Sequence, residues 1–198
     1  MQRKGKTLEL TLASMFIVLI AVGANITTIV PFLVVGGVPI TLQTFFAVLA
    51  GLILGSRLGV ITTSTYAFIG LIGIPVFAQF GAGLGMLIKP TFGFILSFIL
   101  AAYAAGKIVE KKKSTAAYIT ASLVATAINY VIGTNWMYFA YKFVAEAPEG
   151  FDYAMAWLWM LAPLPKDIIL AVLAGVVAHR LKVTVLSKGQ FKNLNLGA

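Results

Sequence analysis

The sequence contains no cysteine and only one histidine, His179. Disulfides and thiolate metal ligands are therefore excluded, and a lone histidine supplies neither a histidine metal cluster nor a Ser-His-Asp triad. Acidic residues are also scarce, with six Asp and Glu in 198 residues. The phosphate-binding pattern GxxxxGK[ST] is absent, so the chain is not expected to hydrolyse ATP. These absences predict a protein that is not an enzyme and that carries no metal or other cofactor.

Charge of either sign is rare. Charged residues make up 11% of the chain and apolar residues 60%, whereas roughly a quarter of the residues of a soluble protein are charged. The mean hydropathy of +0.97 and several long apolar runs identify an integral membrane protein. No polar linker is long enough to separate two cores, so residues 1–198 are expected to form a single membrane-embedded domain.

Six apolar segments predict an all-α, polytopic bundle of six transmembrane helices. Their approximate bounds are Leu10–Ile29, Ile40–Leu54, Leu58–Ile74, Pro90–Ala105, Ala116–Tyr141 and Pro163–Ala178. Several are shorter than the ~20 residues that a straight span needs. An aromatic run with Trp157 and Trp159 precedes the last segment. Its composition fits the membrane interface, or alternatively extends the last helix backwards across Pro163.

The basic residues orient the bundle. With the N-terminus in the cytoplasm, twelve of the 15 Lys and Arg residues fall on the cytoplasmic side. They are Arg3, Lys4, Lys6, Arg57, Lys107, Lys111, Lys112, Lys113, Arg180, Lys182, Lys188 and Lys192. We therefore expect a multi-pass protein of the cell membrane whose tails, residues 1–7 and 183–198, are both cytoplasmic. Because these bases sit at the ends of spans, the net charge of +9 indicates membrane orientation and no nucleic-acid partner.

A glycine-rich stretch, Gly81 to Lys89, interrupts the apolar pattern just before Pro90. Glycine allows left-handed backbone and close approach of a ligand, and proline suits the first turn of a helix. Irregular backbone at membrane depth occurs where protein buries it or where it lines a cavity. The stretch is thus a candidate wall of a binding site or, alternatively, a plain connection outside the membrane.

Three charged residues mark the side opposite the basic ends. Lys89 precedes Pro90, while Lys166 and Asp167 follow Pro165 at the start of the last helix. Ionisable residues at membrane depth usually face a cavity or a partner, so these three are candidate binding residues. Asp167 alternatively caps its helix or pairs with a lysine. Asn25, Gln43, Asn129 and Asn135 lie inside apolar segments and are expected to form interhelical hydrogen bonds.

Three runs carry a resemblance to a known family. They are VPITLQTFFAVLAGLILGSRLG, YAFIGLIGIPVFAQFGAGLGMLIKPTFGFILSFILAAYAAGK and PLPKDIILAVLAG. Together they resemble BioY, the biotin-binding S component of energy-coupling factor (ECF) vitamin transporters, over about Thr7 to Leu181. The resemblance implies the six-helix S-component fold, biotin as ligand, and high-affinity biotin uptake. It also implies a transmembrane coupling subunit (T component) and two ABC ATPases as partners.

The resemblance also implies binding residues. Asp167 matches the family's acidic residue and would accept hydrogen bonds from the ureido N–H groups of biotin. A Gly-Gly-Tyr stretch of many members corresponds to Phe92-Gly93-Phe94, which keeps Gly93 but lacks the tyrosine hydroxyl. A polar residue of some members falls on Gly81, and a lysine one turn after the acid falls on Leu170.

Chemistry suggests what compensates for these departures. Lys89, with the N–H groups of the glycine loop at Gly81, Gly83 and Gly85, is positioned to take a carboxylate. Lys166 either reaches the ureido carbonyl or points to water. Candidate aromatic wall residues are Phe77, Phe80, Phe94, Trp136 and Tyr138.

The first helix is the expected docking surface for the coupling subunit, because many S components carry an Ala-x-x-x-Ala patch there. Ala13 fits its first position, whereas Ile17 does not fit the second. Ala21 and Ala24 offer another set of small residues.

Other functions remain as alternatives. The chain could be an S component for a different vitamin or a biotin relative. A membrane enzyme acting on a lipid would need acidic metal-ligand motifs, and a structural scaffold would not need charges after Pro90 and Pro165.

Overall fold

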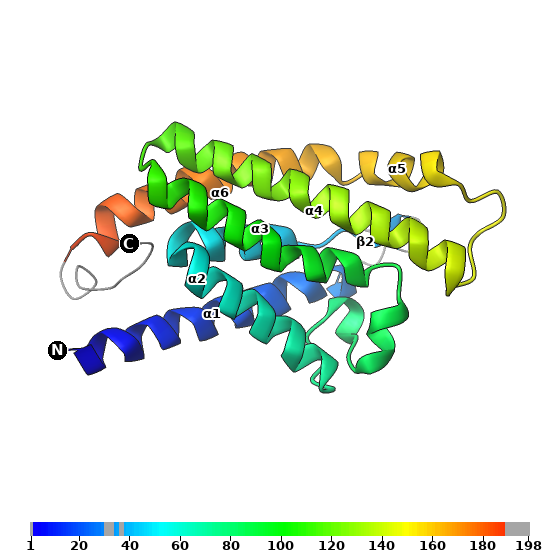
Figure 1. Cartoon of the computed structure of the whole chain (residues 1–198), viewed down its shortest axis with the longest axis horizontal. Helices are drawn as coiled ribbons and strands as arrows, with labels where there is room; N and C mark the ends of the chain where they lie inside the picture. The colour runs from blue at the N-terminus through cyan, green and yellow to red at the C-terminus, as the bar shows by residue number, and fades with distance from the viewer. Residues whose placement is uncertain (1, 30–33, 36–37, 189–198) are drawn as a thin grey trace.

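The computed structural model describes residues 2–29, 34–35 and 38–188 as a bundle of long helices (Figure 1). The helices are α1 (Gln2–Ile29), α2 (Gln43–Leu71), α3 (Phe92–Lys111), α4 (Thr115–Phe143), α5 (Tyr153–Leu161) and α6 (Leu164–Leu181). Two-residue strands β1 (Val34–Val35) and β2 (Val38–Pro39) pair antiparallel between α1 and α2. A short π-helical turn, Lys182–Leu186, extends α6. The predicted all-α class is confirmed.

The element α2 is two helices joined by a sharp turn at Gly55, whose φ of 82° and ψ of 177° are not helical. Gln43 and Tyr66 are hydrogen-bonded to each other, although a straight helix would place residues 23 apart about 35 Å from each other. The chain therefore reverses direction at Gly55, the conformation that glycine adopts without strain. The first half is only about 18 Å long, shorter than the ~30 Å hydrocarbon layer of a membrane.

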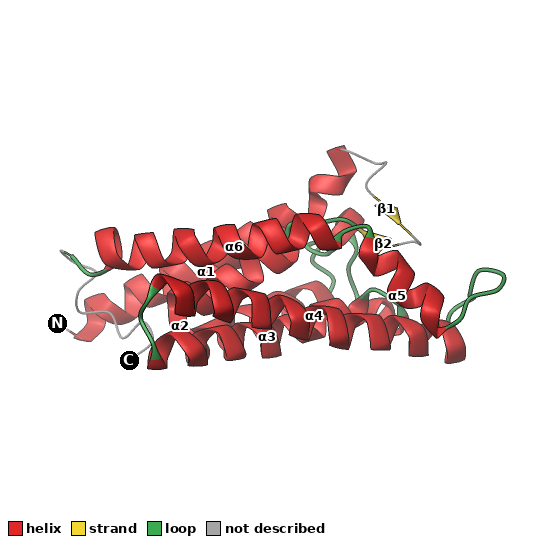
Figure 2. Cartoon of the chain, turned by 90° about the horizontal axis from the view of Figure 1, so that it is seen from above, coloured by secondary structure: helices red, strands yellow, loops and turns green. Residues whose placement is uncertain are grey.

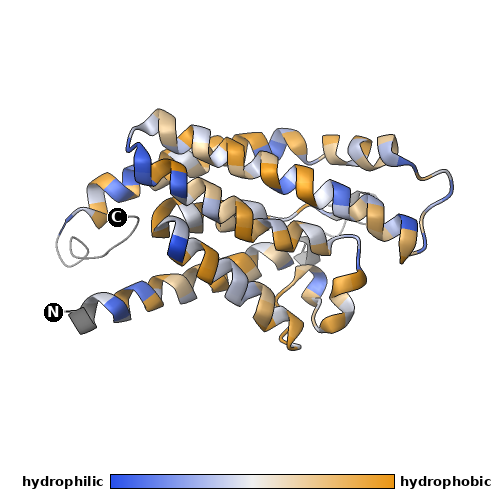
Figure 3. Cartoon of the chain, in the orientation of Figure 1, coloured by the Kyte–Doolittle hydropathy of each residue, from blue (hydrophilic) through white to orange (hydrophobic). Residues whose placement is uncertain are grey.

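Five of the described helices are long and apolar enough to cross a membrane: α1, α2, α3, α4 and α6 with its extension. Because α2 folds back on itself, they supply the six segments that the sequence predicts. Figure 3 shows hydrophobic residues along the helices and hydrophilic ones concentrated towards helix ends and loops. The aromatic run forms its own helix, α5, and does not join α6 across Pro163.

Glycine and alanine let α2 and α3 pack backbone to backbone. A side chain at Gly51 would collide with the backbone of Ala102, and one at Gly106 with the backbone at the Gly55 turn. Such small residues allow the close helix approach that stabilises membrane bundles. Glu110 of α3 caps the turn, because its carboxylate accepts a hydrogen bond of 2.7 Å from the backbone N–H of Ser56.

The helix boundaries differ from the predicted tails. The first helix begins at Gln2, so residues 2–7 are helical, and the chain after Leu181 continues through the π-helical turn. The predicted C-terminal tail lies outside the described residues from 189 onward, which includes Lys192. The start of α1, the π-helical turn after α6, the turn inside α2 and the α3–α4 turn gather at one end of the bundle (Figures 1 and 2). We call this the turn end and the opposite one the cavity end.

Candidate binding site

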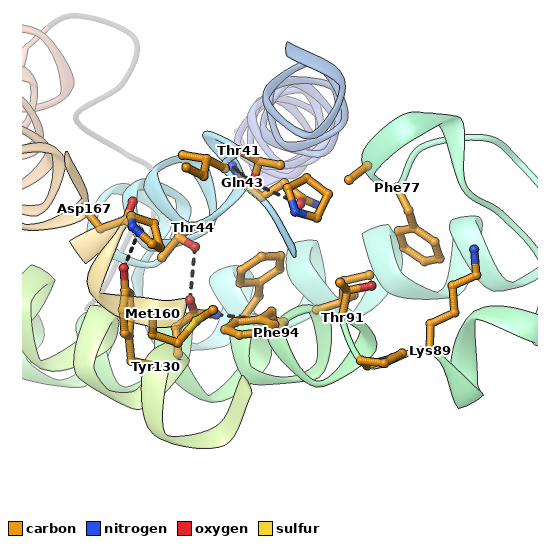
Figure 4. A pocket seen from close by; sticks show the side chains of 18 of the residues that line it. Thr41, Gln43, Thr44, Phe77, Lys89, Thr91, Phe94, Tyr130, Met160 and Asp167 are labelled. Atoms are coloured by element: carbon orange, nitrogen blue, oxygen red, sulfur yellow. Dashed lines mark hydrogen bonds between the residues drawn. The ribbon is translucent and has the colours of Figure 1, made fainter. Parts of the chain in front are cut away.

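A cavity of about 180 Å³ lies at the cavity end of the bundle. Its wall combines the segment before α2, the α2–α3 loop, the first turns of α3 and α6, the middle of α4, and α5. Loops and helix ends therefore meet around it, where the long helices no longer pack tightly. Among its lining residues are the predicted site residues Asp167, Lys166, Lys89 and Phe94 (Figure 4).

Asp167 provides the acidic end of the cavity. Its Oδ2 accepts a hydrogen bond of 2.7 Å from the hydroxyl of Tyr130 on α4, and its Oδ1 pairs with Lys166 Nζ at 2.7 Å. Pro163 and Pro165 start α6 and place Asp167 in its first turn, where the helix dipole favours a negative charge. Each carboxylate oxygen keeps acceptor capacity for a ligand, because it has two lone-pair sites.

Lys166 links Asp167 to the segment before α2. Its Nζ also donates a hydrogen bond of 2.7 Å to the backbone carbonyl of Thr41. The lysine lines the cavity with its side chain 33% exposed, and its two partners hold it beside the acid. It occupies the place next to Asp167 although the lysine that the family resemblance implies, at Leu170, is missing.

Gln43 continues this hydrogen-bonded wall. Thr41 Oγ1 donates to Gln43 Oε1 at 3.1 Å, and Gln43 Nε2 donates to Tyr66 Oη at 2.7 Å. The Tyr66 hydroxyl in turn donates to the carbonyl of Val76 at 2.9 Å. We name the series Tyr130, Asp167, Lys166, Thr41, Gln43, Tyr66 and Val76 the wall chain. It joins α4, α6, both halves of α2 and the α2–α3 loop around the cavity.

Asn129 also lines the cavity, next to Tyr130 of the wall chain. Its Oδ1 accepts from Thr44 at 3.1 Å, and its Nδ2 donates to Ser97 Oγ at 2.6 Å and to the Phe94 carbonyl at 3.2 Å. These bonds use both amide hydrogens. The predicted interhelical role of Asn129 is confirmed. The amide connects α2, α3 and α4 and leaves no N–H donor for a ligand.

Lys89 provides the basic end of the cavity. Its side chain is exposed, and Figure 4 shows it well separated from Asp167. No carboxylate of the described residues lies within ion-pair distance of Lys89 Nζ. Its backbone is held, because the indole N–H of Trp136 donates to the Lys89 carbonyl at 3.2 Å. The cavity therefore has a paired acid at one end and a cation available to an anion at the other.

Apolar side chains separate these two ends. Phe77, Phe94, Phe98, Met86 and Met160 line the cavity between them. Such walls with few polar groups are typical of small-molecule sites. In the described part of the chain no group of three or more His, Asp or Glu side chains could hold a metal ion.

The α2–α3 loop is built from short helical turns at Ala78–Phe80 and Leu84–Ile88, as irregular as predicted. Gln79 and Phe80 have φ of 57° and 54°, which is unusual for residues other than glycine. Asn25 of α1 holds this conformation, because its Oδ1 accepts a hydrogen bond of 2.7 Å from the Phe80 N–H. Gln79 thereby lies in the cavity wall.

The glycines of this loop do not take the role expected for them. The N–H of Gly81 donates to Ala78 and that of Gly83 to Gly70, so neither is free for a carboxylate. Neither Gly81, Gly83 nor Gly85 lines the cavity. The described residues of this loop that do so are Phe77, Ala78, Gln79, Met86, Lys89, Pro90 and Thr91. The loop does line the site, but through side chains instead of glycine backbone.

Gly93 and the predicted aromatic residues mostly serve packing. A side chain at Gly93 would collide with Trp136, and one at Gly133 would collide with Phe94, so α3 and α4 interlock through two glycine–aromatic pairs. Trp136 and Tyr138 lie outside the cavity wall, and Tyr138 packs against Phe151. Phe80 is 58% exposed.

The predicted docking residues on α1 are not available as a set. Ala13 and Ala24 are 6% and 0% exposed because they face the protein's own core, and Ala21 is half-buried. Their small side chains let α1 approach the bundle itself. The expected Ala13–Ala24 docking patch is therefore corrected: a partner that meets α1 would contact its other face.

Several wall residues were not predicted to meet a ligand. Tyr130, Thr41, Thr44, Tyr141 and Met160 line the cavity, and so does Gln43, for which only an interhelical bond was expected. Thr41 and Gln43 are polar residues in an apolar region just before and at the start of α2, and this was a weak indication in the sequence that the start of α2 lines a site. Nothing in the sequence pairs Tyr130 with Asp167, because they are 37 residues apart on different helices.

Comparison with known proteins agrees with this geometry. The family model for the BioY family matches residues 1–187. BioYB of Bacillus subtilis is 45% identical over 89% of this chain and 88% of its own length. The biotin transporter BioY of Thermotoga maritima is 36% identical over 88% of this chain and 95% of its own.

A solved structure shows the same fold. The crystal structure of the S-component for biotin from an ECF-type ABC transporter superposes with a TM-score of 0.75 at 22% identity, over 94% of this chain and 95% of that one. Identity at that level supports a shared fold only. Membership of the family is shown by the family match and by the relatives with higher identity. The protein is a membrane protein that belongs to the BioY family.

Proposed function

We propose that the protein binds biotin in this cavity and takes it up across the cell membrane as the substrate-capture component of an ECF-type transporter. The observation that carries the proposal is a cavity with apolar walls that has Asp167 at one end and Lys89 at the other, where no carboxylate of the described residues pairs with Lys89. Biotin has the matching sequence of groups: a ureido ring with N–H donors, an apolar middle and a carboxylate. The names of the relatives support the same ligand.

The cavity suggests how the ligand lies. The ureido N–H groups face Asp167, whose remaining lone pairs accept them. The thiophane ring and valeryl chain contact Phe77, Phe94 and Met160. The carboxylate extends towards Lys89, which meets it as an exposed cation.

Uptake needs an energy source that the chain lacks, since no phosphate-binding motif occurs in it. We therefore assign a T component and two ABC ATPases as partners, and place both termini in the cytoplasm with the turn end facing these subunits. The protein itself acts without catalysis. The clustering of basic residues at the turn end supports this orientation through the positive-inside rule.

The test is a calorimetric titration of the purified protein in detergent with biotin, with desthiobiotin, thiamine and riboflavin as further ligands. We expect 1:1 binding of biotin without ATP or partner subunits, weaker binding of desthiobiotin, and none of the other two vitamins. A folded sample that binds thiamine or riboflavin but not biotin would assign the protein to another vitamin. A folded sample that binds none of them would overturn the proposal.

Orientation is tested separately. Single cysteines placed at Lys113 and Glu149 of this cysteine-free chain should react differently with a membrane-impermeant maleimide on intact cells. Glu149 is expected to be labelled from outside and Lys113 only after lysis. The reverse pattern would contradict the cytoplasmic placement of the turn end.

A further inference from the structure

Gln43 holds a hydrogen-bond donor that has no partner among the described residues. The side chain lines the cavity and is 7% exposed. One amide hydrogen goes to Tyr66, and the carbonyl oxygen accepts from Thr41. A primary amide carries two N–H donors, and the second has no partner in the described part of the chain. A buried donor without a partner destabilises the free protein and favours a ligand that can accept it.

The orientation of this amide follows from its neighbours. Tyr66 donates its only hydrogen to the Val76 carbonyl at 2.9 Å, so its oxygen must accept from Gln43. Thr41 Oγ1 already accepts from the Gln43 backbone N–H at 3.3 Å and donates to Oε1 at 3.1 Å. Nε2 therefore faces Tyr66 and Oε1 faces Thr41. With the amide flipped, Oε1 would face the accepting oxygen of Tyr66, and the Nε2 hydrogens would face the hydroxyl hydrogen of Thr41.

Figure 4 shows Gln43 on the cavity wall between Asp167 and Phe77. Thr41 and Lys166 connect it to Asp167 through hydrogen bonds of 3.1 Å, 2.7 Å and the ion pair of 2.7 Å. Asp167 and Gln43 therefore belong to one hydrogen-bonded wall of the same cavity. The acid is an acceptor, and the amide adds a donor beside it.

We propose that Gln43 determines specificity for a urea: its second amide N–H donates to the carbonyl oxygen of the ligand's ureido ring while Asp167 accepts from the ring N–H. This inference rests on the proposed function, because it concerns the same cavity and the same ligand. It predicts that the site binds a ligand more weakly when the carbonyl of its ring is replaced by a group that only donates hydrogen bonds. Asp167 alone would not provide that discrimination, since a carboxylate attracts such a cationic ring more strongly than a neutral one.

The probe is 2-iminobiotin, in which a guanidinium replaces the urea and offers no acceptor. Wild-type protein should bind biotin and desthiobiotin, which share the urea, better than 2-iminobiotin. In Gln43→Met, which removes the donor at similar size, biotin affinity should fall about tenfold while 2-iminobiotin affinity stays constant. In Gln43→Glu, an isosteric acceptor, the preference should shift further towards 2-iminobiotin.

The matched control is Tyr66→Phe, which removes the hydroxyl that anchors Gln43 but leaves the amide itself. It should alter the affinities for both ligands by a similar factor. Thermal unfolding of each variant in detergent confirms that it is folded before its affinities are compared.

The ratio of the two affinities decides the question. A Gln43→Met variant that weakens biotin and 2-iminobiotin equally, or neither, would overturn the assignment and make Gln43 a purely structural residue. If wild-type protein bound neither compound, the proposed function itself would fail, and this inference with it.

Discussion

The turn end and the cavity end of the bundle differ in how closely their helices approach each other. At the turn end, Gly51, Gly106 and Ala102 let the backbones of α2 and α3 touch, and Glu110 caps the turn at Gly55. At the cavity end α3 and α4 still interlock, but loops and helix starts leave a cavity between the elements, and the hydrogen bonds of the wall chain connect those elements. Close packing at one end thus supports, at the other, a cavity with apolar walls and charged ends. Substitutions at the turn end should change stability, and those at the cavity end should change affinity.

The largest effect is expected at the turn end. In Gly106→Ala the new methyl group would meet the backbone of Ser56 and Gly55, which cannot move aside as a flexible side chain would. We expect a loss of about 3 kcal/mol in the free energy of unfolding, typical of severe overpacking, visible as a low yield of folded protein and a reduced melting temperature. The control is Gly85→Ala, where nothing lies within 4 Å of the added methyl group. Equal melting of the two variants would disprove the tight packing.

Asp167→Asn should have the largest effect at the cavity end. The amide loses the negative charge that pairs with Lys166 and accepts ligand N–H groups. We expect biotin affinity to fall by more than tenfold, about 1.4 kcal/mol, with a small change in melting temperature. Asp152→Asn is the matched control, because Asp152 caps α5 outside the cavity wall and asparagine caps equally well. Unchanged affinity in Asp167→Asn would limit that residue to helix capping.

Lys89→Met should have a smaller effect, because an exposed cation in water contributes little. We expect about a threefold loss of biotin affinity at low salt, and no loss for biotin amide, which lacks the carboxylate. Lys142→Met removes a cation that lies over the Tyr138 ring outside the cavity and serves as the control. A Lys89 variant that weakened both ligands equally would contradict the proposed position of the carboxylate.

The smallest effect is expected for Glu110 at the turn end. Glu110→Gln keeps an acceptor for the Ser56 N–H but removes the charge that also pairs with Lys107 at 3.3 Å. We expect a loss of about 0.4 kcal/mol in the free energy of unfolding and unchanged biotin affinity. Glu149→Gln, in the α4–α5 loop, is the charge-matched control. Reduced affinity in Glu110→Gln without loss of stability would show that the two ends are not independent.

Local chemistry made much of the architecture predictable. Long apolar runs indicate membrane helices whatever they pack against, and Pro90, Pro163 and Pro165 mark helix starts because proline lacks a backbone donor. Asp167, Lys166 and Lys89 were recognisable as site candidates because charge at membrane depth is costly. All three line the cavity.

Other predictions failed where a residue's neighbours decide its role. Gly81 and Gly83 looked available to a ligand, but their N–H groups bond within the loop and to Gly70. Ala13 and Ala24 looked like docking residues, yet small side chains serve internal and external helix contacts equally well, and here they are internal.

The class of the protein, its spans, the concentration of basic residues at span ends and the charged residues of the site can all be predicted from the sequence, because they depend on composition and local order. Which of these groups meet depends on the fold. The bond between Tyr130 and Asp167 and the link from Lys166 to Thr41 join residues far apart in the chain. The spare donor of Gln43 appears only once its partners are known. Hydrogen bonding depends on distance and direction between side chains, and folding alone sets both.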